Sequence, residues 1–373
     1  MKYYLIAGEA SGDLHGSNLM KQINLKDANA QFRFWGGDKM AETGGKPVKH
    51  IRDLAFMGFT EVLANLKTIL NNISLCENDI LEFNPDALIL IDYPGFNLRI
   101  AKKIKPSGIK IFYYISPQVW AWKQSRVHTI KKVVNKMMVI LPFEQEFYQK
   151  FDFAVDFVGH PLLDAIELKS DEEKKSLRRE WKVENKKVVA LLPGSRKQEI
   201  SKMLPIMLQM KKHFSNIHFM IAGAPAIDAS FYAPFLDENT EILYGRTYDI
   251  LSVADAALVT SGTATLETAL FGVPEVVCYK GGKISYQIAK KLIKVKYISL
   301  VNLIMDEPVI KELIQDDLNE SNLKNELDLL LNDSKYIQNI KTDFIKLRTK
   351  LGGGGASEVT ANLVLKTLQQ SSI

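Results

Sequence analysis

Three glycine-containing loops each follow an apolar run and open a helical pattern, an arrangement suited to binding phosphate. The first loop is Gly8-Glu9-Ala10-Ser11-Gly12-Asp13. Glycine lets backbone N–H groups approach an anion closely at a helix start. The glycines are spaced more widely than in the dinucleotide fingerprint, which disfavours NAD. A purely structural strand-to-helix turn is the alternative. The residues expected to contact a ligand are Gly8, Glu9, Ser11, Gly12 and Asp13.

The other two loops lie in the second half of the chain and contain groups that a nucleoside diphosphate needs. In Leu192-Pro193-Gly194-Ser195-Arg196, the guanidinium could clamp a pyrophosphate through two parallel hydrogen bonds. Segment 261–267 supplies N–H and hydroxyl donors, and then a carboxylate that can accept both ribose hydroxyls. The alternatives are a solvated surface arginine and ordinary helix-start residues. The predicted nucleotide contacts are Ser195, Arg196, Gly262, Thr263, Thr265 and Glu267.

Asp92 is the candidate general base. It follows the apolar run Ala87–Ile91 and precedes Tyr93-Pro94, so we expect it to face a ligand crevice at the end of a strand. A carboxylate in that place could accept the proton of an attacking sugar hydroxyl. The alternative is that it only stabilises the turn before the proline, because Asp favours turns.

The sequence contains no pattern that predicts a metal site. His15, His128 and His160 have no ligand spacing, and no Asp-x-Asp pair stands at a strand end to hold a divalent cation. Charge on a leaving diphosphate should then be stabilised by Arg196 and by helix N-termini. We expect no metal and no cofactor.

The elements that must position these loops are short apolar runs alternating with helical patterns. That alternation predicts parallel sheets with crossover helices. Two domains suit a chain of 373 residues with 46% hydrophobic content. We therefore predict an α/β protein with two similar Rossmann-like halves. The expected strands are Tyr3–Ala7, Ala87–Ile91, Lys110–Ile115, Met137–Leu141, Val155–Val158, Val188–Leu192, His218–Ala222, Ala256–Val259 and Glu275–Tyr279.

The boundary between the halves is expected in the polar stretch that follows Gly159-His160-Pro161, where charge density rises. This predicts domains at 1–165 and 166–355, with the ligand site in the crevice between them. Gly352–Gly355 predicts a turn, and Ser357 can cap a last helix over 356–373.

The charge and cysteine content restrict partners and compartment. A net charge of +5 does not indicate nucleic-acid binding, but basic residues such as Lys123 and Arg126 suit phosphorylated substrates or an anionic membrane. Cys76 and Cys278, far apart in the sequence, support neither a disulfide nor a zinc site, so cytosol is the expected compartment. No stretch has the length of a membrane-spanning helix, and any membrane contact should be peripheral.

An apolar stripe at helical spacing between Phe59 and Ile73 is the candidate for such contact. Core packing is the more common role of such a stripe, because nearly every helix in an α/β protein has one. Trp120 and Trp122 add weight to the membrane interpretation, because Trp prefers interfaces. The candidate membrane contacts are Val62, Leu63, Leu66, Ile69 and Leu70.

Four motifs in this order resemble those of the lipid-A-disaccharide synthase family and span almost the whole chain. The resemblance implies two Rossmann-like domains facing a crevice, in the GT-B type of glycosyltransferase architecture. It implies an inverting hexosyltransferase that moves 2,3-diacylglucosamine from its UDP derivative to 2,3-diacylglucosamine 1-phosphate. The product would be a β(1→6)-linked lipid A disaccharide 1-phosphate, with release of UDP and without a metal. The motifs are Gly8-Glu9-Ala10-Ser11-Gly12-Asp13, Ser116-Pro117-Gln118-Val119-Trp120-Ala121-Trp122, Leu192-Pro193-Gly194-Ser195-Arg196 and Gly262-Thr263-Ala264-Thr265-Leu266-Glu267.

The family's functional positions carry over residue by residue. Asp92 matches the family's proposed base, and Arg196, Glu267 and Asn302 match nucleotide-site positions. Inversion suits a single in-line attack with one base and no covalent intermediate. Gly95 stands where the family often has a second Asp, which removes a rival base, and a valine precedes the asparagine where the family often has Pro.

The resemblance also implies a place in the cell and an assembly. It suggests an enzyme on the cytoplasmic face of the bacterial inner membrane, attached peripherally to the anionic lipid surface. It further suggests a homodimer with exchanged C-terminal segments, so helix 356–373 either packs back on the first domain or is exchanged.

Two other functions fit the same loops. A UDP-N-acetylglucosamine 2-epimerase-like isomerase would share the fold but needs no acyl-binding surface and no acceptor. A nucleotide-binding regulatory protein would bind UDP without catalysis. The Trp120/Trp122 group and the apolar stripe favour an enzyme that handles lipid.

Overall fold

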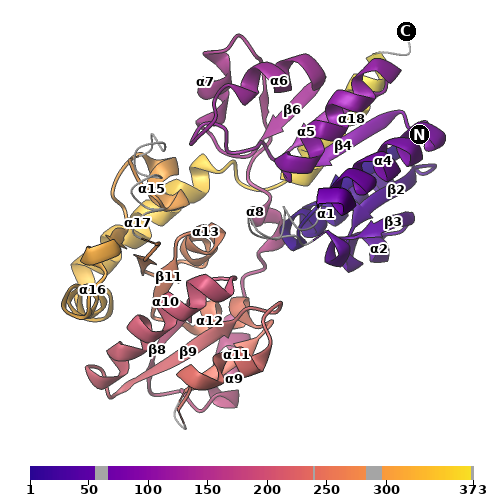
Figure 1. The fold of residues 1–373 in the computed structure, drawn as a ribbon. Helices are drawn as coiled ribbons and strands as arrows, with labels where there is room; N and C mark the ends of the chain where they lie inside the picture. The colour runs from indigo at the N-terminus through magenta and orange to yellow at the C-terminus, as the bar shows by residue number, and fades with distance from the viewer. Residues whose placement is uncertain (55–65, 238–239, 283–295, 371–373) are drawn as a thin grey trace. The chain divides into compact units, whose positions relative to one another are not determined.

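Two parallel sheets organise the chain, one in each of two units (Figure 1). The computed structural model describes residues 1–54, 66–237, 240–282 and 296–370. The first unit contains Met1–Ala165 and the chain from Leu351 onward, and the second contains Ile166–Lys350. The predicted fold class, α/β with two Rossmann-like halves, is confirmed.

The sheet of the first unit has seven strands in the order β3-β2-β1-β4-β5-β6-β7, and every neighbouring pair is parallel. This is the doubly wound order, and its direction reverses between β1 and β4. The strands are β1 (Lys2–Ala7), β2 (Gln31–Gly36), β3 (Lys46–His50), β4 (Ala87–Ile91), β5 (Lys110–Tyr114), β6 (Lys136–Val139) and β7 (Asp156–Phe157). The helices are α1 (Ala10–Lys26), α2 (Asp38–Thr43), α4 (Leu66–Phe83), α5 (Pro94–Ile104), α6 (Arg126–Val133), α7 (Glu144–Gln149), α8 (Leu162–Ala165) and α18 (Ala356–Gln370).

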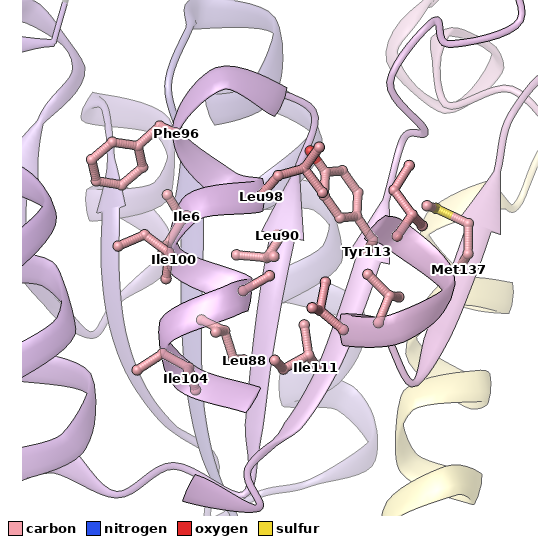
Figure 2. Close-up of a cluster of buried hydrophobic side chains, with 14 of the residues drawn as sticks. Ile6, Leu88, Leu90, Phe96, Leu98, Ile100, Ile104, Ile111, Tyr113 and Met137 are labelled. Carbon is pink, nitrogen blue, oxygen red and sulfur yellow. The ribbon is translucent and has the colours of Figure 1, made fainter. Parts of the chain in front are cut away.

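Helices cover both faces of this sheet, because successive strand residues point to opposite sides. Leu88 and Leu90 of β4 face α5, and Figure 2 shows them gathered with Ile100 and Ile104 of that helix. The alternate residues of the strands pack against α1 and against the C-terminal helix α18. The strands are therefore buried on both faces, which explains why they read as continuous apolar runs.

Helix α18 packs back on the first unit, against α1, α8 and β5, and Figure 1 shows this yellow helix among the purple elements. The chain returns at Leu351, a few residues before the predicted boundary at 355. Two contacts explain the difference. The backbone N–H of His160 donates to the Leu351 carbonyl at 2.9 Å, and the Asp164 carboxylate accepts the Gly355 N–H at 2.6 Å. The glycine turn is thus fastened to the first unit.

The sheet of the second unit has six strands in the order β10-β9-β8-β11-β12-β13, again parallel throughout. Its direction reverses between β8 and β11. The strands are β8 (Lys187–Leu192), β9 (Ile217–Gly223), β10 (Glu241–Tyr244), β11 (Ala256–Thr260), β12 (Glu275–Tyr279) and β13 (Lys311–Ile314). The helices are α9 (Asp171–Glu180), α10 (Lys197–Leu208), α11 (Ala229–Tyr232), α12 (Thr247–Val253), α13 (Thr263–Leu270), α15 (Leu300–Met305), α16 (Glu320–Asn332) and α17 (Ser334–Lys350).

Candidate functional site

The first loop and the candidate base meet at the reversal point of the first sheet. Ala7 of β1 and Ile91 of β4 are register partners, so Gly8 and Asp92 leave the same edge of the sheet side by side. Ligands in doubly wound folds bind at this position, outside the carboxyl ends of the strands.

Asp92 sits on a tight turn between strand and helix. Asp92 and Tyr93 both have left-handed backbone angles, with φ of 44° and 46°. Each such residue costs of order 1–3 kcal/mol and persists only where its surroundings fix it. The Asn97 side-chain amide and the Tyr113 hydroxyl fix it here, because both donate to the Asp92 carbonyl at 2.7 Å. The turn therefore holds the Asp92 side chain at the sheet edge.

The surroundings make this carboxyl a stronger base than an ordinary aspartate. Burial and, to a lesser extent, the negative charge of Glu9 in the neighbouring loop together raise the pKa of Asp92 to about 6. A base whose pKa lies near the working pH is well matched to proton transfer. At neutral pH the group is ionised and able to accept a proton.

A pocket of about 210 Å³ opens beside Asp92 within the first unit. Its other walls come from the turn into α5, from the segment after β5 and from the start of α6. The sequence identifies segment 116–122 as a family motif but does not assign it to a site. Its position in the pocket wall is a finding of the structure. The lining residues are Asp92, Pro94, Pro117, Gln118, Val119, Trp122 and Arg126.

The two tryptophans of this segment have different environments. Trp120 is buried and packs edge-on against Phe143, with ring centroids 5.0 Å apart. Trp122 is 48% exposed, and its ring carries Lys123 Nζ at 4.6 Å and the Arg126 guanidinium at 5.5 Å from the centroid. Trp120 thus anchors the loop, and Trp122 contacts two cationic side chains near the mouth of the pocket.

The five candidate residues of the first loop separate into two groups. Glu9 and Ser11 are exposed at the start of α1. Gly8 and Gly12 are buried, and glycine is needed at both for close packing: a Cβ on Gly8 would lie 2.3 Å from the Tyr93 ring, and one on Gly12 would lie 3.2 Å from Cβ of Ala7.

Asp13, the last of the five, is committed to the fold. It is 4% exposed, and its carboxylate accepts the backbone N–H groups of Gly37, Lys39 and Met40 at 2.7–3.1 Å. These bonds hold the start of α2. This carboxylate therefore has a structural role, and its predicted contact with a ligand stays a prediction.

In the second unit, the two predicted nucleotide loops also meet at a reversal point. Leu192 of β8 and Val259 of β11 are register partners, so Ser195 and Gly262 follow neighbouring strands. Arg196 precedes α10, and its side chain is 65% exposed, with a loose contact to Glu199 at 3.6 Å. The Glu199 carboxylate instead accepts the backbone N–H groups of Ser195 and Arg196 at 3.1 and 3.3 Å, which shapes the turn and leaves the guanidinium accessible.

The third loop presents its backbone and holds its carboxylate in place. Gly262 and Thr263 are exposed at the start of α13, whereas the Thr265 hydroxyl donates to the Gly262 carbonyl at 2.9 Å and closes the turn. Glu267 lies one turn in and accepts the Tyr248 hydroxyl at 2.7 Å. Burial raises the pKa of Glu267. Tyr248 thus orients a carboxylate that keeps acceptor capacity for a ligand hydroxyl.

Asn302, the remaining predicted nucleotide contact, is held by hydrogen bonds inside the second unit. It is 1% exposed. Its amide donates to the Ile310 carbonyl at 2.9 Å and to Glu312 at 3.0 Å, and its carbonyl accepts the Ile310 N–H at 3.0 Å. These bonds tie α15 to the segment that enters β13. The residue thus shapes this region from within, and its contact with UDP stays a prediction.

The apolar stripe contributes to the core at one end. Ile73 on α4 is 4% exposed and belongs to the first unit's core, and Ile69 packs partly against that core. Leu70, in contrast, is 52% exposed. Val62 and Leu63 lie outside the described residues, and of Leu66 only its place in the helix is described. Leu70 is thus the candidate whose side chain the structure shows at the surface.

The described ranges contain neither a metal-binding cluster nor a membrane-spanning helix. No group of three or more His, Cys, Asp or Glu side chains there is arranged to hold a metal ion. Nor does any helix in those ranges combine the length and the apolar character needed to cross a bilayer.

The chain resembles known proteins in both its sequence and its structure. The family model described as lipid-A-disaccharide synthetase matches residues 3–366. The lipid-A-disaccharide synthase of Trichlorobacter lovleyi is 39% identical over 377 aligned positions, covering 98% of this chain and 97% of the relative.

Solved structures share the fold at much lower identity. The UDP-GlcNAc 2-epimerase of Neisseria meningitidis, bound to UDP-GlcNAc, has a TM-score of 0.70 at 13% identity, covering 98% of this chain and 100% of that one. The glycotransferase of kitacinnamycin has a TM-score of 0.65 at 13% identity, covering 98% and 99%. These likenesses support the GT-B type architecture of two Rossmann-like domains, and at this identity they do not extend to activity.

The contact between Gly8 and Tyr93 generates a stability prediction. A Gly8→Ala variant must displace the Tyr93 ring, and overpacking of this kind typically costs about 1–3 kcal/mol. We expect a clear fall in melting temperature, measured by differential scanning calorimetry. Gly95→Ala is the matched control, because a Cβ there meets nothing within 4 Å. Equal melting temperatures for the two variants would show that the close contact is unimportant.

Proposed function

The chain belongs to the lipid-A-disaccharide synthase family, and we propose that it transfers a 2,3-diacylglucosaminyl group from its UDP derivative to 2,3-diacylglucosamine 1-phosphate. The products are a β(1→6)-linked disaccharide 1-phosphate and UDP. The family match over residues 3–366 carries this proposal. The half-buried carboxyl of Asp92, at the reversal point of the first sheet, supplies a base suited to the reaction.

Asp92 acts as the general base in this proposal. Its carboxylate takes the proton of the acceptor's primary hydroxyl while that oxygen attacks C1 of the donor sugar. The bond between C1 and the diphosphate oxygen breaks, and UDP leaves with the bonding electrons. Attack from the face opposite the leaving group inverts the α-linked donor to a β-linked product. The pKa of about 6 lets the same carboxyl hold the proton and then release it at neutral pH.

The second unit binds the UDP portion of the donor. Arg196 is exposed beside the loop after β8, and a guanidinium can clamp a diphosphate in bidentate fashion. The exposed start of α13 directs N–H groups toward an anion, and Glu267 accepts hydrogen bonds from the ribose hydroxyls. No step in this scheme requires a metal ion.

Assay of the wild type with synthetic acylated donor and acceptor, read by mass spectrometry, tests the function. A disaccharide 1-phosphate should form only when both substrates are present. An epimerase would convert a UDP-sugar without any acceptor, and a regulatory protein would convert neither. The epimerase alternative rests on shared fold at 13% identity, whereas the synthase relative is 39% identical over nearly the whole chain.

The acylated substrates lead us to place the enzyme at an anionic membrane surface on the cytoplasmic side. The exposed Leu70, and Trp122 with Lys123 on its ring, are the described groups that support this attachment. Apolar side chains would enter the interface, and cations would meet lipid phosphates.

Asp92→Asn tests the base. The variant should fold and bind UDP normally but lose kcat by about 10²–10⁴-fold, the usual contribution of a positioned base. In the wild type, kcat/KM should fall as the pH drops through about 6, because protonation removes the basic form, and the variant should lack this limb. Glu9→Gln should move the limb to lower pH, since it removes a charge that raises the pKa of Asp92. A kcat for Asp92→Asn within a few-fold of wild type, with chemistry rate-limiting, would refute the assignment.

Arg196→Ala and Glu267→Ala test the nucleotide site. Each removes a charge-assisted contact worth roughly 1.5–3 kcal/mol, so UDP affinity measured by calorimetry should fall about tenfold to a hundredfold. Lys202→Ala, on the exposed surface of the same helix α10, is the matched control and should bind UDP normally. Unchanged affinity in both test variants would remove these residues from the site.

Leu70→Ser tests the membrane contact. Flotation with anionic liposomes should decrease in the variant without a change in melting temperature, and wild-type binding should weaken with salt, because exposed charges are screened beyond a Debye length of ~8 Å. Leu329→Ser is the matched control, because Leu329 is a 40% exposed leucine on α16 of the second unit.

Ile73→Ser should instead lower the melting temperature, since Ile73 belongs to the core of the first unit. Equal flotation of the Leu70 and Leu329 variants would exclude Leu70 from the contact.

A further inference from the structure

Arg126 lines the pocket beside Asp92 and has no assigned role in the reaction. It is the first residue of α6, is half-buried, and forms part of the 210 Å³ pocket wall. Its position brings a guanidinium into the same pocket as the candidate base. A cation so placed needs a physical explanation, because it adds a positive charge to a partly desolvated site.

No ion pair within the described part of the chain neutralises the charge of Arg126. Arg33 and Arg178 pair with Asp79 and Asp255 at 2.7 and 3.0 Å, and Arg246 pairs with Asp249 at 2.7 Å. For Arg126, the described residues provide contact with the Trp122 ring and no ion pair.

Contact with the Trp122 ring, 5.5 Å from its centroid, uses none of the N–H donors of the guanidinium. These donors lie in the plane of the group. They match two oxygens of a phosphate or carboxylate. The donors of Arg126 therefore stay available for an anion that the protein does not itself supply.

The pocket suits a sugar headgroup better than a whole lipid. Its volume of about 210 Å³ is below the roughly 300 Å³ at which ordinary ligand pockets begin, so acyl chains must lie outside it. The proposed acceptor has one hydroxyl that must lose a proton and one phosphate whose charge must be balanced. The pocket provides one carboxylate and one unpaired guanidinium.

We infer that Arg126, in contact with the Trp122 ring, binds the phosphate monoester of the acceptor and selects a phosphorylated acceptor over an unphosphorylated one. The inference rests on the proposed function, because it assigns the acceptor to the pocket that contains Asp92. The donor's diphosphate offers the same chemistry, and the experiment separates the two sources.

The test compares two acceptors with three proteins. Wild type, Arg126→Gln and the control Lys132→Gln, an exposed change on the same helix α6, are assayed with 2,3-diacylglucosamine 1-phosphate and with 2,3-diacylglucosamine in mixed micelles. Arg126→Gln should lower kcat/KM for the phosphorylated acceptor by about tenfold to a hundredfold, mainly through KM. With the unphosphorylated acceptor, wild type and variant should agree. If wild type turns that compound over too slowly, its inhibition constant gives the same comparison.

Supporting measurements identify other outcomes. UDP affinity and melting temperature should be the same in Arg126→Gln and wild type. Arg126→Lys should recover part of the loss, because it restores the charge but not the planar fork.

An equal loss with both acceptors would overturn the inference in favour of a general structural role, and weakened UDP binding would overturn it by assigning Arg126 to the donor. If wild type forms no disaccharide at all, the proposed function fails and the inference fails with it. Disaccharide formation with an unchanged phosphate preference in Arg126→Gln would overturn the inference alone.

Discussion

The reversal of strand order in a parallel sheet is the constraint on which both halves of the site depend. Crossover connections on either side of the reversal leave toward opposite faces, so the carboxyl ends of the two middle strands are left uncovered. In the first unit the pairing of Ala7 with Ile91 places Gly8 beside Asp92. In the second unit the pairing of Leu192 with Val259 does the same for the loops that contain Arg196 and Gly262. The register between neighbouring apolar strands thus places the polar groups of the loops side by side at the edge of each sheet.

Within that frame, a strained turn sets the chemistry of Asp92. Two consecutive left-handed residues would be unfavourable alone, but two donors on the Asp92 carbonyl stabilise the turn. The same turn places the Tyr93 ring over Gly8, so the base and the first loop are packed as one body. Burial in this body raises the pKa of Asp92. Backbone strain, glycine packing and basicity are consequences of one local structure.

The sequence predicted what depends on burial and missed what depends on specific partners. All nine expected strands exist, with ends within two residues, because strands buried on both faces are continuous apolar runs. Segments such as Lys46–His50 and Lys311–Ile314 were missed because edge strands have exposed faces and polar residues. Asp13 and Asn302 have the residue types of ligand-binding groups, but backbone groups of the fold occupy them, and no local pattern reveals those distant partners.

The charges around Asp92 must be considered together. A phosphate entering the pocket would bring negative charge beside a carboxylate whose pKa Glu9 already raises, and like charges favour the protonated form. Protonation would remove the base at the moment when it is needed. A guanidinium in the same pocket wall offsets the phosphate charge, so that a bound acceptor leaves Asp92 ionised. Through one electrostatic contact, Arg126 would then both recognise the acceptor phosphate and keep Asp92 in its basic form. This accounts for an unpaired cation in the pocket that contains the base.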